Sequence, residues 1–121
     1  MNEYRSHRDL TVWQKSMDLA VACYGLAREL PWFERYGLAP QMRRAAVSIP
    51  ANIAEGYGQR TRKQYGCYLV SARGSARELD THLELAVRCE LLKRARIQNG
   101  CAILDEVTRM LTTMVRKLDQ P

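Results

Sequence analysis

The chain is most regularly patterned between residues 41 and 56, which read Gln41-Met42-Arg43-Arg44-Ala45-Ala46-Val47-Ser48-Ile49-Pro50-Ala51-Asn52-Ile53-Ala54-Glu55-Gly56. Apolar side chains recur here every three or four residues. Polar side chains recur at the same spacing, at Gln41, Arg44, Ser48, Asn52 and Glu55. This spacing is typical of an α-helix with two different sides. The segment therefore predicts a helix with one packed face and one polar face whose groups are specifically satisfied.

Pro50 lies inside this predicted helix. An interior proline removes a backbone hydrogen bond, crowds the carbonyl group of Ala46, and costs about 3 kcal/mol or more. Either the helix ends at Ile49, or it continues with a kink. The apolar series passes Pro50 without a change of phase, which favours a kinked but continuous helix.

The composition favours an all-α protein of one domain, residues 1–121. Aromatic residues make up only 7% of the chain, so its core must be built from Leu, Val, Ile, Met and Ala. These residues suit close helix packing better than a β-sandwich. No stretch approaches the roughly 20 apolar residues of a membrane span, and the first residues lack the apolar run of a signal peptide.

The cysteines and histidines do not have metal-site spacing. Neither histidine, His7 or His82, is spaced for zinc, and the four cysteines are far apart: Cys23, Cys67, Cys89 and Cys101. We therefore expect no metal, no cofactor, and reduced thiols in a cytoplasmic protein.

Apolar periodicity predicts four helices, at about residues 9–29, 38–57, 62–91 and 95–119. Asp9 and Thr61 are candidate caps for the first and third helices. The first helix carries a second apolar line, which predicts contacts on two of its sides. The third helix carries a line of apolar residues spaced alternately by four and three residues, as in the packing seam of a helical bundle. This seam comprises Tyr65, Leu69, Ala72, Ala76, Leu79, Leu83 and Ala86. Short connections between such helices predict an antiparallel up-down-up-down four-helix bundle.

Two large aromatic residues, Trp32 and Phe33, lie in the turn that follows Pro31. We expect them to form a plug over the end of the bundle. A ligand site is the alternative.

Antiparallel packing of the second and third helices predicts a structural polar network between them. It places Arg44 level with Glu78, and Ser48 level with Gly74, with Ser75 on the same stripe as Glu78. If buried, Arg44 and Glu78 must form an ion pair, and Gly74 would let the two backbones approach closely. The alternative makes Arg44 a phosphate ligand. The network comprises Gln41, Arg44, Ser48, Asn52, Glu55, Ser75 and Glu78.

No group of residues predicts catalysis. Asp80 falls on a different helix face from Ser75 and His82, and no oxyanion loop accompanies them. Glu55 and Glu78 are better explained as cap or ion-pair residues than as paired catalytic carboxylates.

The charge balance points to a polyanion. The net charge is +6, and most of the cations are arginines, whose planar fork can hold phosphate at two points. Arg73 and Arg77 are one helical turn apart and repel each other slightly. The candidate nucleic-acid-binding set comprises Arg43, Arg60, Arg62, Lys63, Arg73 and Arg77. The alternative is that these are ordinary solvated cations.

Several motifs are long enough to compare with a family: Leu10-Thr11-Val12-Trp13-Gln14-Lys15, Gly37-Leu38 with Gln41, residues 43–56, and Ala72-Arg73-Gly74-Ser75-Ala76-Arg77-Glu78-Leu79. Together they closely resemble the four-helix-bundle proteins first noted as products of 23S rRNA intervening sequences. The resemblance implies a small bacterial protein that forms a ring-shaped homopentamer. A more distant relative, the accessory variability determinant of diversity-generating retroelements, is a basic pentamer that works with a reverse transcriptase and binds nucleic acid.

From the residues and the resemblance together, we expect a non-enzymatic homo-oligomer that binds RNA or DNA through its basic surface, as an accessory factor. The alternative is an oligomeric adaptor or scaffold that recognises a protein partner. A shared stripe of cations would favour the first function, whereas scattered or internally paired cations and an exposed apolar patch would favour the second.

Overall fold

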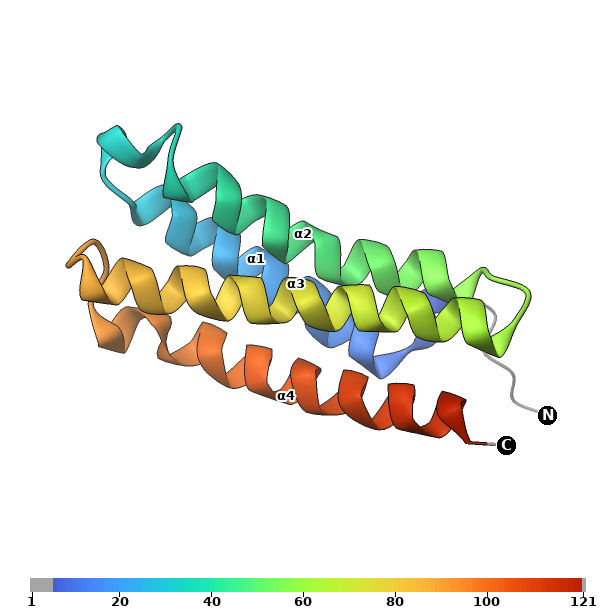
Figure 1. Ribbon diagram of the computed structural model, residues 1–121. Helices are drawn as coiled ribbons and strands as arrows, with labels where there is room; N and C mark the ends of the chain where they lie inside the picture. Colours follow the sequence, from blue (N-terminus) through green and yellow to red (C-terminus); the bar gives the residue numbers. More distant parts are fainter. Residues whose placement is uncertain (1–5, 121) are drawn as a thin grey trace.

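The computed structural model describes residues 6–120 and contains no strand within them. It comprises two 3-10 helices, η1 (His7–Asp9) and η2 (Trp32–Glu34), and the helices α1 (Thr11–Glu29), α2 (Leu38–Tyr57), α3 (Arg62–Arg88) and α4 (Arg94–Asp119). The predicted all-α fold is confirmed (Figure 1). None of the helices within residues 6–120 combines the length and apolarity needed to cross a bilayer.

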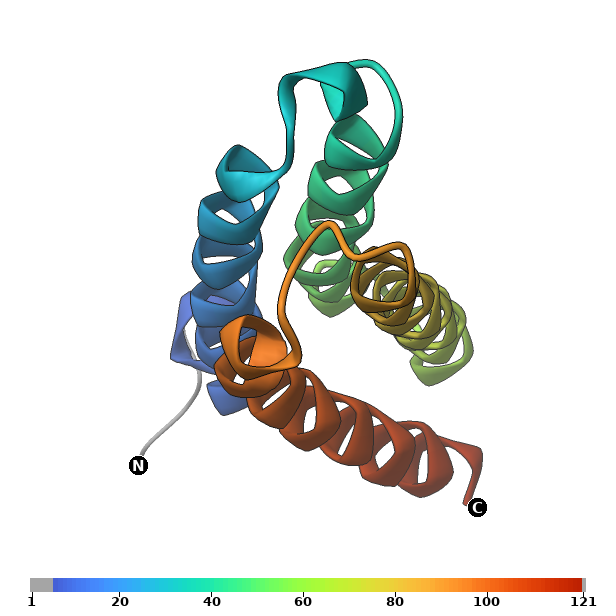
Figure 2. The ribbon, with the colours of Figure 1, turned by 90° about the vertical axis from the view of Figure 1, so that its left-hand side faces the viewer.

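The four long helices alternate in direction along the bundle. Each packs against the next in sequence, and α1 also packs against α4, so the helices surround a common interior. The α1–α2 and α3–α4 connections lie at one end, and the α2–α3 turn lies at the other (Figures 1 and 2). The up-down-up-down four-helix bundle is therefore confirmed.

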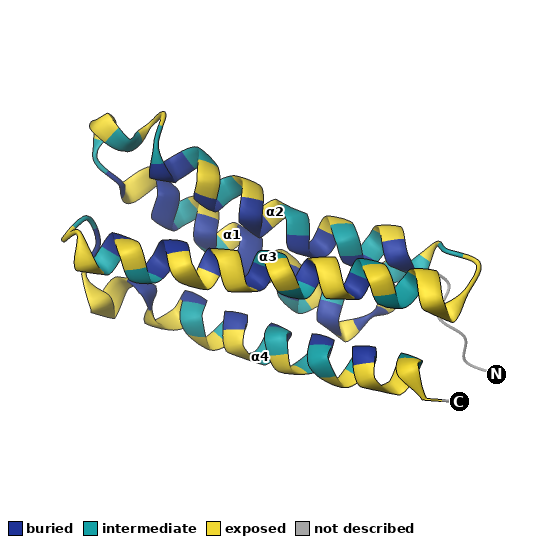
Figure 3. Cartoon of the chain, in the orientation of Figure 1, coloured by how far each residue is buried: buried dark blue, intermediate teal, exposed yellow. Residues whose placement is uncertain are grey.

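The core lies between these helices and is aliphatic. Its largest fully buried side chains include Leu19, Met42, Ile49, Leu79 and Leu111. Burying each contributes roughly 1.5–3 kcal/mol relative to leaving it exposed. The predicted α3 seam is buried from Leu69 onward. Buried residues follow the inward sides of the helices, and exposed residues follow the outer sides (Figure 3).

Helix α2 continues through Pro50 for two further turns, so the alternative in which it ends at Ile49 is wrong. Pro50 is itself buried, and Ile49 and Ile53 are fully buried on either side of it. Packing of both flanking turns offsets the lost backbone hydrogen bond.

Gly56, not Gly74, marks the close approach of α2 and α3. A Cβ atom at Gly56 would lie 2.7 Å from Cβ of Tyr68 and 3.0 Å from Cδ1 of Tyr65. Gly74 is exposed, and a Cβ atom there would meet nothing within 4 Å. The prediction for Gly74 is wrong because that residue faces solvent, while the two helices converge towards the turn that joins them.

Side chains cap the N-terminal ends of two of the long helices. Thr61 Oγ1 accepts a hydrogen bond of 3.1 Å from the backbone N–H of Gln64, as predicted. Glu34 Oε1 accepts one of 2.8 Å from the backbone N–H of Leu38 and so caps α2 from η2. The N-cap position of α1 is Leu10, not the predicted Asp9.

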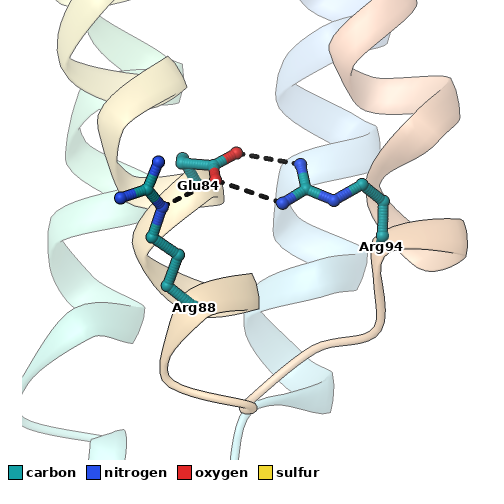
Figure 4. A network of polar contacts seen from close by, with 3 residues as sticks. All are labelled: Glu84, Arg88 and Arg94. Carbon is teal, nitrogen blue, oxygen red and sulfur yellow. Dashed lines mark hydrogen bonds and ion pairs between the residues drawn. The ribbon is translucent and has the colours of Figure 1, made fainter.

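Helix α3 ends at Arg88, earlier than expected. Glu90 adopts a φ of 61°, in the left-handed region, which the α-helix cannot accommodate. Beside this turn, Glu84 accepts hydrogen bonds from Arg88 (2.9 Å) and Arg94 (2.9 and 3.1 Å), so one carboxylate fastens α3 to α4 (Figure 4). These bonds, from Arg94 first and then Arg88, lower the pKa of Glu84 to about 2.

Candidate nucleic-acid interface

Four of the six candidate cations follow the edge of α3 that faces α4. Arg62 and Lys63 line a groove of about 660 Å³ whose other wall includes Val115 and Leu118 of α4. Arg77 lines a smaller cavity of about 190 Å³ between the same two helices. Arg73 lies one turn before Arg77 on the same stripe. We call these four residues the α3 edge.

Arg62 has a structural role within this edge. Its guanidinium donates a hydrogen bond of 2.8 Å to the carbonyl oxygen of Lys117 and a longer one of 3.5 Å to that of Gln120. A cation at the C-terminal end of α4 also offsets the negative end of the helix dipole. Arg62 is nevertheless exposed, so its remaining donors stay accessible.

Further cations gather at the end of the bundle where α3 begins and α4 ends. Arg60 is exposed in the α2–α3 turn, next to the first residues of the α3 edge. Arg116 and Lys117 are exposed in the last turn of α4. Sequence reasoning missed these two residues, although cations in the last turn of a helix are a recognisable signal.

Arg43 does not belong to this surface. On α2 it shares a stripe with Val47 and Pro50, which lie four and seven residues further on. Both line an open groove of about 450 Å³ against Met17, Val21 and other residues of α1, which we call the α1/α2 groove. Arg43 thus faces the α1 side of α2, whereas the α3 edge faces α4.

The candidate cations are not neutralised internally. Among residues 6–120, the ion pairs connect other cations with carboxylates: Lys15 with Glu106, Arg88 and Arg94 with Glu84, Arg96 with Glu29, and Arg109 with Asp105. Burial leaves Nε of Arg73 without a hydrogen-bond partner. An unpaired buried donor is costly, and a bound acceptor such as a phosphate oxygen would remove that cost only if it reached Nε.

Acidic residues divide the groove between α3 and α4 into a basic end and a mixed middle. Asp80 and Asp105 line the small cavity beside Arg77, and Asp105 also pairs with Arg109 at 3.1 Å. At the basic end, Asp119 is the acidic residue among those lining the large groove. Along this groove, exposed cations therefore exceed carboxylates most clearly where the turn, the start of α3 and the end of α4 meet.

The predicted polar network forms in part. The hydroxyl groups of Ser48 and Ser75 are 2.8 Å apart, and Asn52 Nδ2 donates to the carbonyl oxygen (2.8 Å) and hydroxyl (2.9 Å) of Ser48. These contacts join α2 to α3 at a half-buried position.

The predicted ion pair of Arg44 and Glu78 is wrong. Both side chains are exposed, and no ion pair within residues 6–120 connects them. Ala45, the next residue, is buried. Successive residues of an α-helix are about 100° apart around its axis, so Arg44 points towards solvent. Gln41 and Glu55 are also exposed, so these four residues do not join the serine–asparagine cluster.

The comparisons with known proteins agree with this architecture. The family model for the 23S rRNA-intervening sequence protein matches residues 8–113. The chain belongs to that family. A crystal structure of a protein of unknown function from the S23 ribosomal protein family of Bacteroides thetaiotaomicron is similar, with 26% identity and a TM-score of 0.82. The similarity covers 88% of this chain and 99% of that one. No curated protein matches the chain.

One feature of this intervening-sequence family member contradicts the sequence prediction. Trp32, Phe33 and Tyr36 do not plug the bundle, because they are 82%, 59% and 85% exposed. We call these three side chains the aromatic tip. The connection that carries them projects from the α1–α2 side of the bundle and does not fold over its end (Figure 2).

Proposed function

We propose that this member of the intervening-sequence family is a non-enzymatic, oligomeric helical bundle that binds RNA or another nucleic acid as a cytoplasmic accessory factor. The observation that carries the proposal is the gathering of unneutralised cations along the α3 edge and at the adjoining end, where Arg60, Arg116 and Lys117 join it. The four cysteines are free thiols, which suits a reducing compartment.

The arrangement suits the phosphate backbone more than base edges. The α3 edge follows a helix of 27 residues, so its cations are spread along a line that a nucleic-acid strand can follow. Contacts of this kind position the strand and carry little sequence information. Binding should therefore be tolerant of sequence and strongly dependent on salt.

Oligomerisation would raise the affinity of such a surface. One protomer offers few phosphate contacts, whereas several linked protomers bind a strand at high effective concentration. The homopentamer implied by the family resemblance would present five copies of the α3 edge.

The environments of Ser75 and His82 favour a non-enzymatic role. The hydroxyl of Ser75 lies 2.8 Å from that of Ser48, and His82 is only 6% exposed. A nucleophile and its general base need hydrogen-bond contact with each other and access to substrate.

Fluorescence anisotropy with a labelled single-stranded RNA tests this proposal. The parent protein should bind at low salt and micromolar concentration. Lys63→Glu and Arg77→Glu should each weaken binding and make the dependence of log affinity on log salt shallower by about 1. Arg62 is unsuitable because its substitution would also release the end of α4.

Lys93→Glu is the matched control for Lys63→Glu, since it makes the same charge change at an exposed residue just before α4, at the other end of the bundle. Its affinity should remain closer to the parent value than that of either α3-edge variant. The proposal is excluded if the parent gives no anisotropy change at low salt, or if Lys93→Glu is as damaging as Lys63→Glu.

The alternative function, an adaptor for a protein partner, is favoured by a different observation. The aromatic tip and the α1/α2 groove expose apolar side chains, including Val21 at 70% and Val47 at 44%. Pull-down from native cells with and without nuclease separates the two functions, because a protein bound through RNA is lost on nuclease treatment and a directly bound partner is retained.

A further inference from the structure

The aromatic tip is rigid although it is exposed. Pro31 precedes it, and backbone hydrogen bonds from Glu34 to Pro31 (2.9 Å) and from Arg35 to Trp32 (3.1 Å) fold it into η2. The Glu34 carboxylate then fixes η2 to the start of α2. A preformed apolar projection loses little conformational entropy when it binds.

The rings of the tip make few contacts within their own chain. Trp32 and Phe33 meet edge to face, with centroids 6.0 Å apart, and the Arg35 guanidinium lies 5.1 Å from the centre of the Tyr36 ring. Their high exposure leaves most of each ring in solvent. Aromatic side chains of this size bury roughly 150–250 Å² each when they are covered.

The α1/α2 groove has the opposite shape. Met17, Val21 and Tyr24 of α1 form one wall, and Val47 and Pro50 of α2 form the other. Its volume of about 450 Å³ falls within the range of roughly 300–1,000 Å³ that is typical of pockets for compact apolar groups. Val21 is 70% exposed, so the groove is not covered by its own chain.

We propose that the aromatic tip of one copy of this chain inserts into the α1/α2 groove of a second copy. The inference deepens the proposed function, and it rests on that proposal's homo-oligomer. Projection and groove occur in every molecule, so each copy offers both halves of a head-to-tail contact, which closes into a ring when its rotation allows.

The charges around the two surfaces are mixed. Arg28 lines the groove, and Asp18 is exposed further along the same stripe of α1. The tip carries Arg35, also exposed, beside Tyr36. The pairing therefore depends on apolar contact, and repulsion between Arg28 and Arg35 restricts the directions in which the tip can insert.

The sizes of the surfaces also fit a contact between copies. Three aromatic side chains and the groove that receives them make up a large part of the roughly 800 Å² per partner in a stable interface. Left uncovered, a patch of this composition is a liability for aggregation. A second copy is the partner that is always present at a matching concentration.

Analytical ultracentrifugation of the full chain tests the proposal with one tip variant and one groove variant. Trp32→Ala combined with Phe33→Ala truncates the tip, and Val47→Glu places a charge in the groove. Each should weaken self-association by roughly tenfold or more. Both should keep the parent's circular dichroism and melting behaviour, because the substituted side chains are exposed.

Val70→Glu is the matched control. Val70 is 45% exposed, almost equal to Val47 at 44%, but it lines the groove between α3 and α4. Its self-association should equal that of the parent.

Mixing the two defective proteins gives the most specific test. The Val47→Glu protein keeps its tip, and the Trp32→Ala/Phe33→Ala protein keeps its groove, so the mixture should form a heterodimer through one intact contact. The proposal is overturned if the parent is monomeric, if the tip variant associates like the parent, or if the mixture forms no heterodimer. If the groove variant dissociates while the tip variant associates like the parent, the groove has another occupant, either a different segment of the second copy or another protein. That result would also overturn the proposal.

Failure here remains distinguishable from failure of nucleic-acid binding. A parent that is monomeric but shifts RNA anisotropy overturns the insertion and the homo-oligomer on which it rests, and leaves nucleic-acid binding supported. A parent that assembles through tip and groove but leaves the RNA anisotropy unchanged excludes nucleic-acid binding alone.

Discussion

The hydroxyl group of Ser75 belongs to a small polar cluster that fixes the register of α2 against α3. It lies 2.8 Å from the Ser48 hydroxyl, which also accepts from Asn52. Such half-buried hydrogen bonds contribute little net free energy to folding, because the same groups form hydrogen bonds with water in the unfolded chain. Their value to this protein lies mainly in selecting one register.

We expect Ser75→Ala to lower the free energy of unfolding by about 1 kcal/mol relative to its control, because it leaves Ser48 with fewer partners. The control is Ser71→Ala, an exposed serine one turn earlier on α3. Both substitutions replace serine by alanine in a helix and so gain the same helix propensity. The difference between the free energies of unfolding of the two variants, measured by urea denaturation, therefore reports the contribution of the hydrogen bond. Equal stabilities would show that the contact is energetically neutral.

The buried imidazole of His82 makes stability depend on pH. It is 6% exposed, and Nδ1 has no hydrogen-bond partner. Burial lowers the pKa of His82 below its usual 6.5, although Glu78 acts in the opposite direction. Between the lowered folded-state pKa and about 6.5, the unfolded chain therefore binds a proton that the folded chain does not.

The free energy of unfolding should consequently fall as the pH falls below about 6.5. His82→Leu removes the titrating group and should flatten the profile between about pH 7 and pH 5, before most carboxylates become protonated. Denaturation of both proteins at several pH values checks this. The same slope in parent and variant would be inconsistent with a neutral buried imidazole.

At the scale of the elements, a close approach of two helices depends on one glycine. Helices α2 and α3 meet at Gly56, against the side chains of Tyr65 and Tyr68. Both tyrosines are held partly buried on α3, so neither can move away freely.

We expect Gly56→Ala to destabilise the protein by about 1–3 kcal/mol, because the new methyl group overlaps Cβ of Tyr68. Gly74→Ala should instead stabilise it by up to about 1 kcal/mol, since open space surrounds that site and alanine favours the helix. Thermal denaturation of the two variants measures the contrast. Opposite shifts are required, and a stabilised Gly56→Ala protein would contradict this account of the α2–α3 crossing.

At the scale of the whole molecule, charge and apolar surface lie on different sides of the bundle. The α3 edge faces α4, while the apolar groove lies between α1 and α2. Assembly through the apolar side would leave the basic side of every copy free for a polyanion.

The salt dependence of RNA binding should therefore reflect assembly. Four cations per α3 edge give a slope of log affinity against log salt of about −3 for single-stranded RNA, and an assembly that shares one strand should give a steeper slope. The assembly-deficient Val47→Glu protein should approach the value of one protomer. Anisotropy titrations at several KCl concentrations measure both slopes, and equal slopes would contradict strand sharing.

Local chemistry accounts for what could be predicted from the sequence. Four helices, the continuity of α2 through Pro50, the α3 seam and the Thr61 cap all follow from residue spacing and side-chain capping, which act within a few turns of the chain. The contact of Ser48 with the α3 stripe that carries Ser75 was also predictable. A short turn between two antiparallel helices fixes which residues of one helix lie beside which residues of the other.

The rotation of each helix about its own axis, and the path of each connection, were decided only by tertiary packing. That rotation turned Arg44 and Glu78 to solvent, separated Arg43 from the α3 edge, and placed the close approach at Gly56 instead of Gly74. The α1–α2 connection likewise left Trp32 in solvent although a large aromatic residue favours burial. Sequence period fixes which residues share a face, but the neighbouring helices determine where that face points.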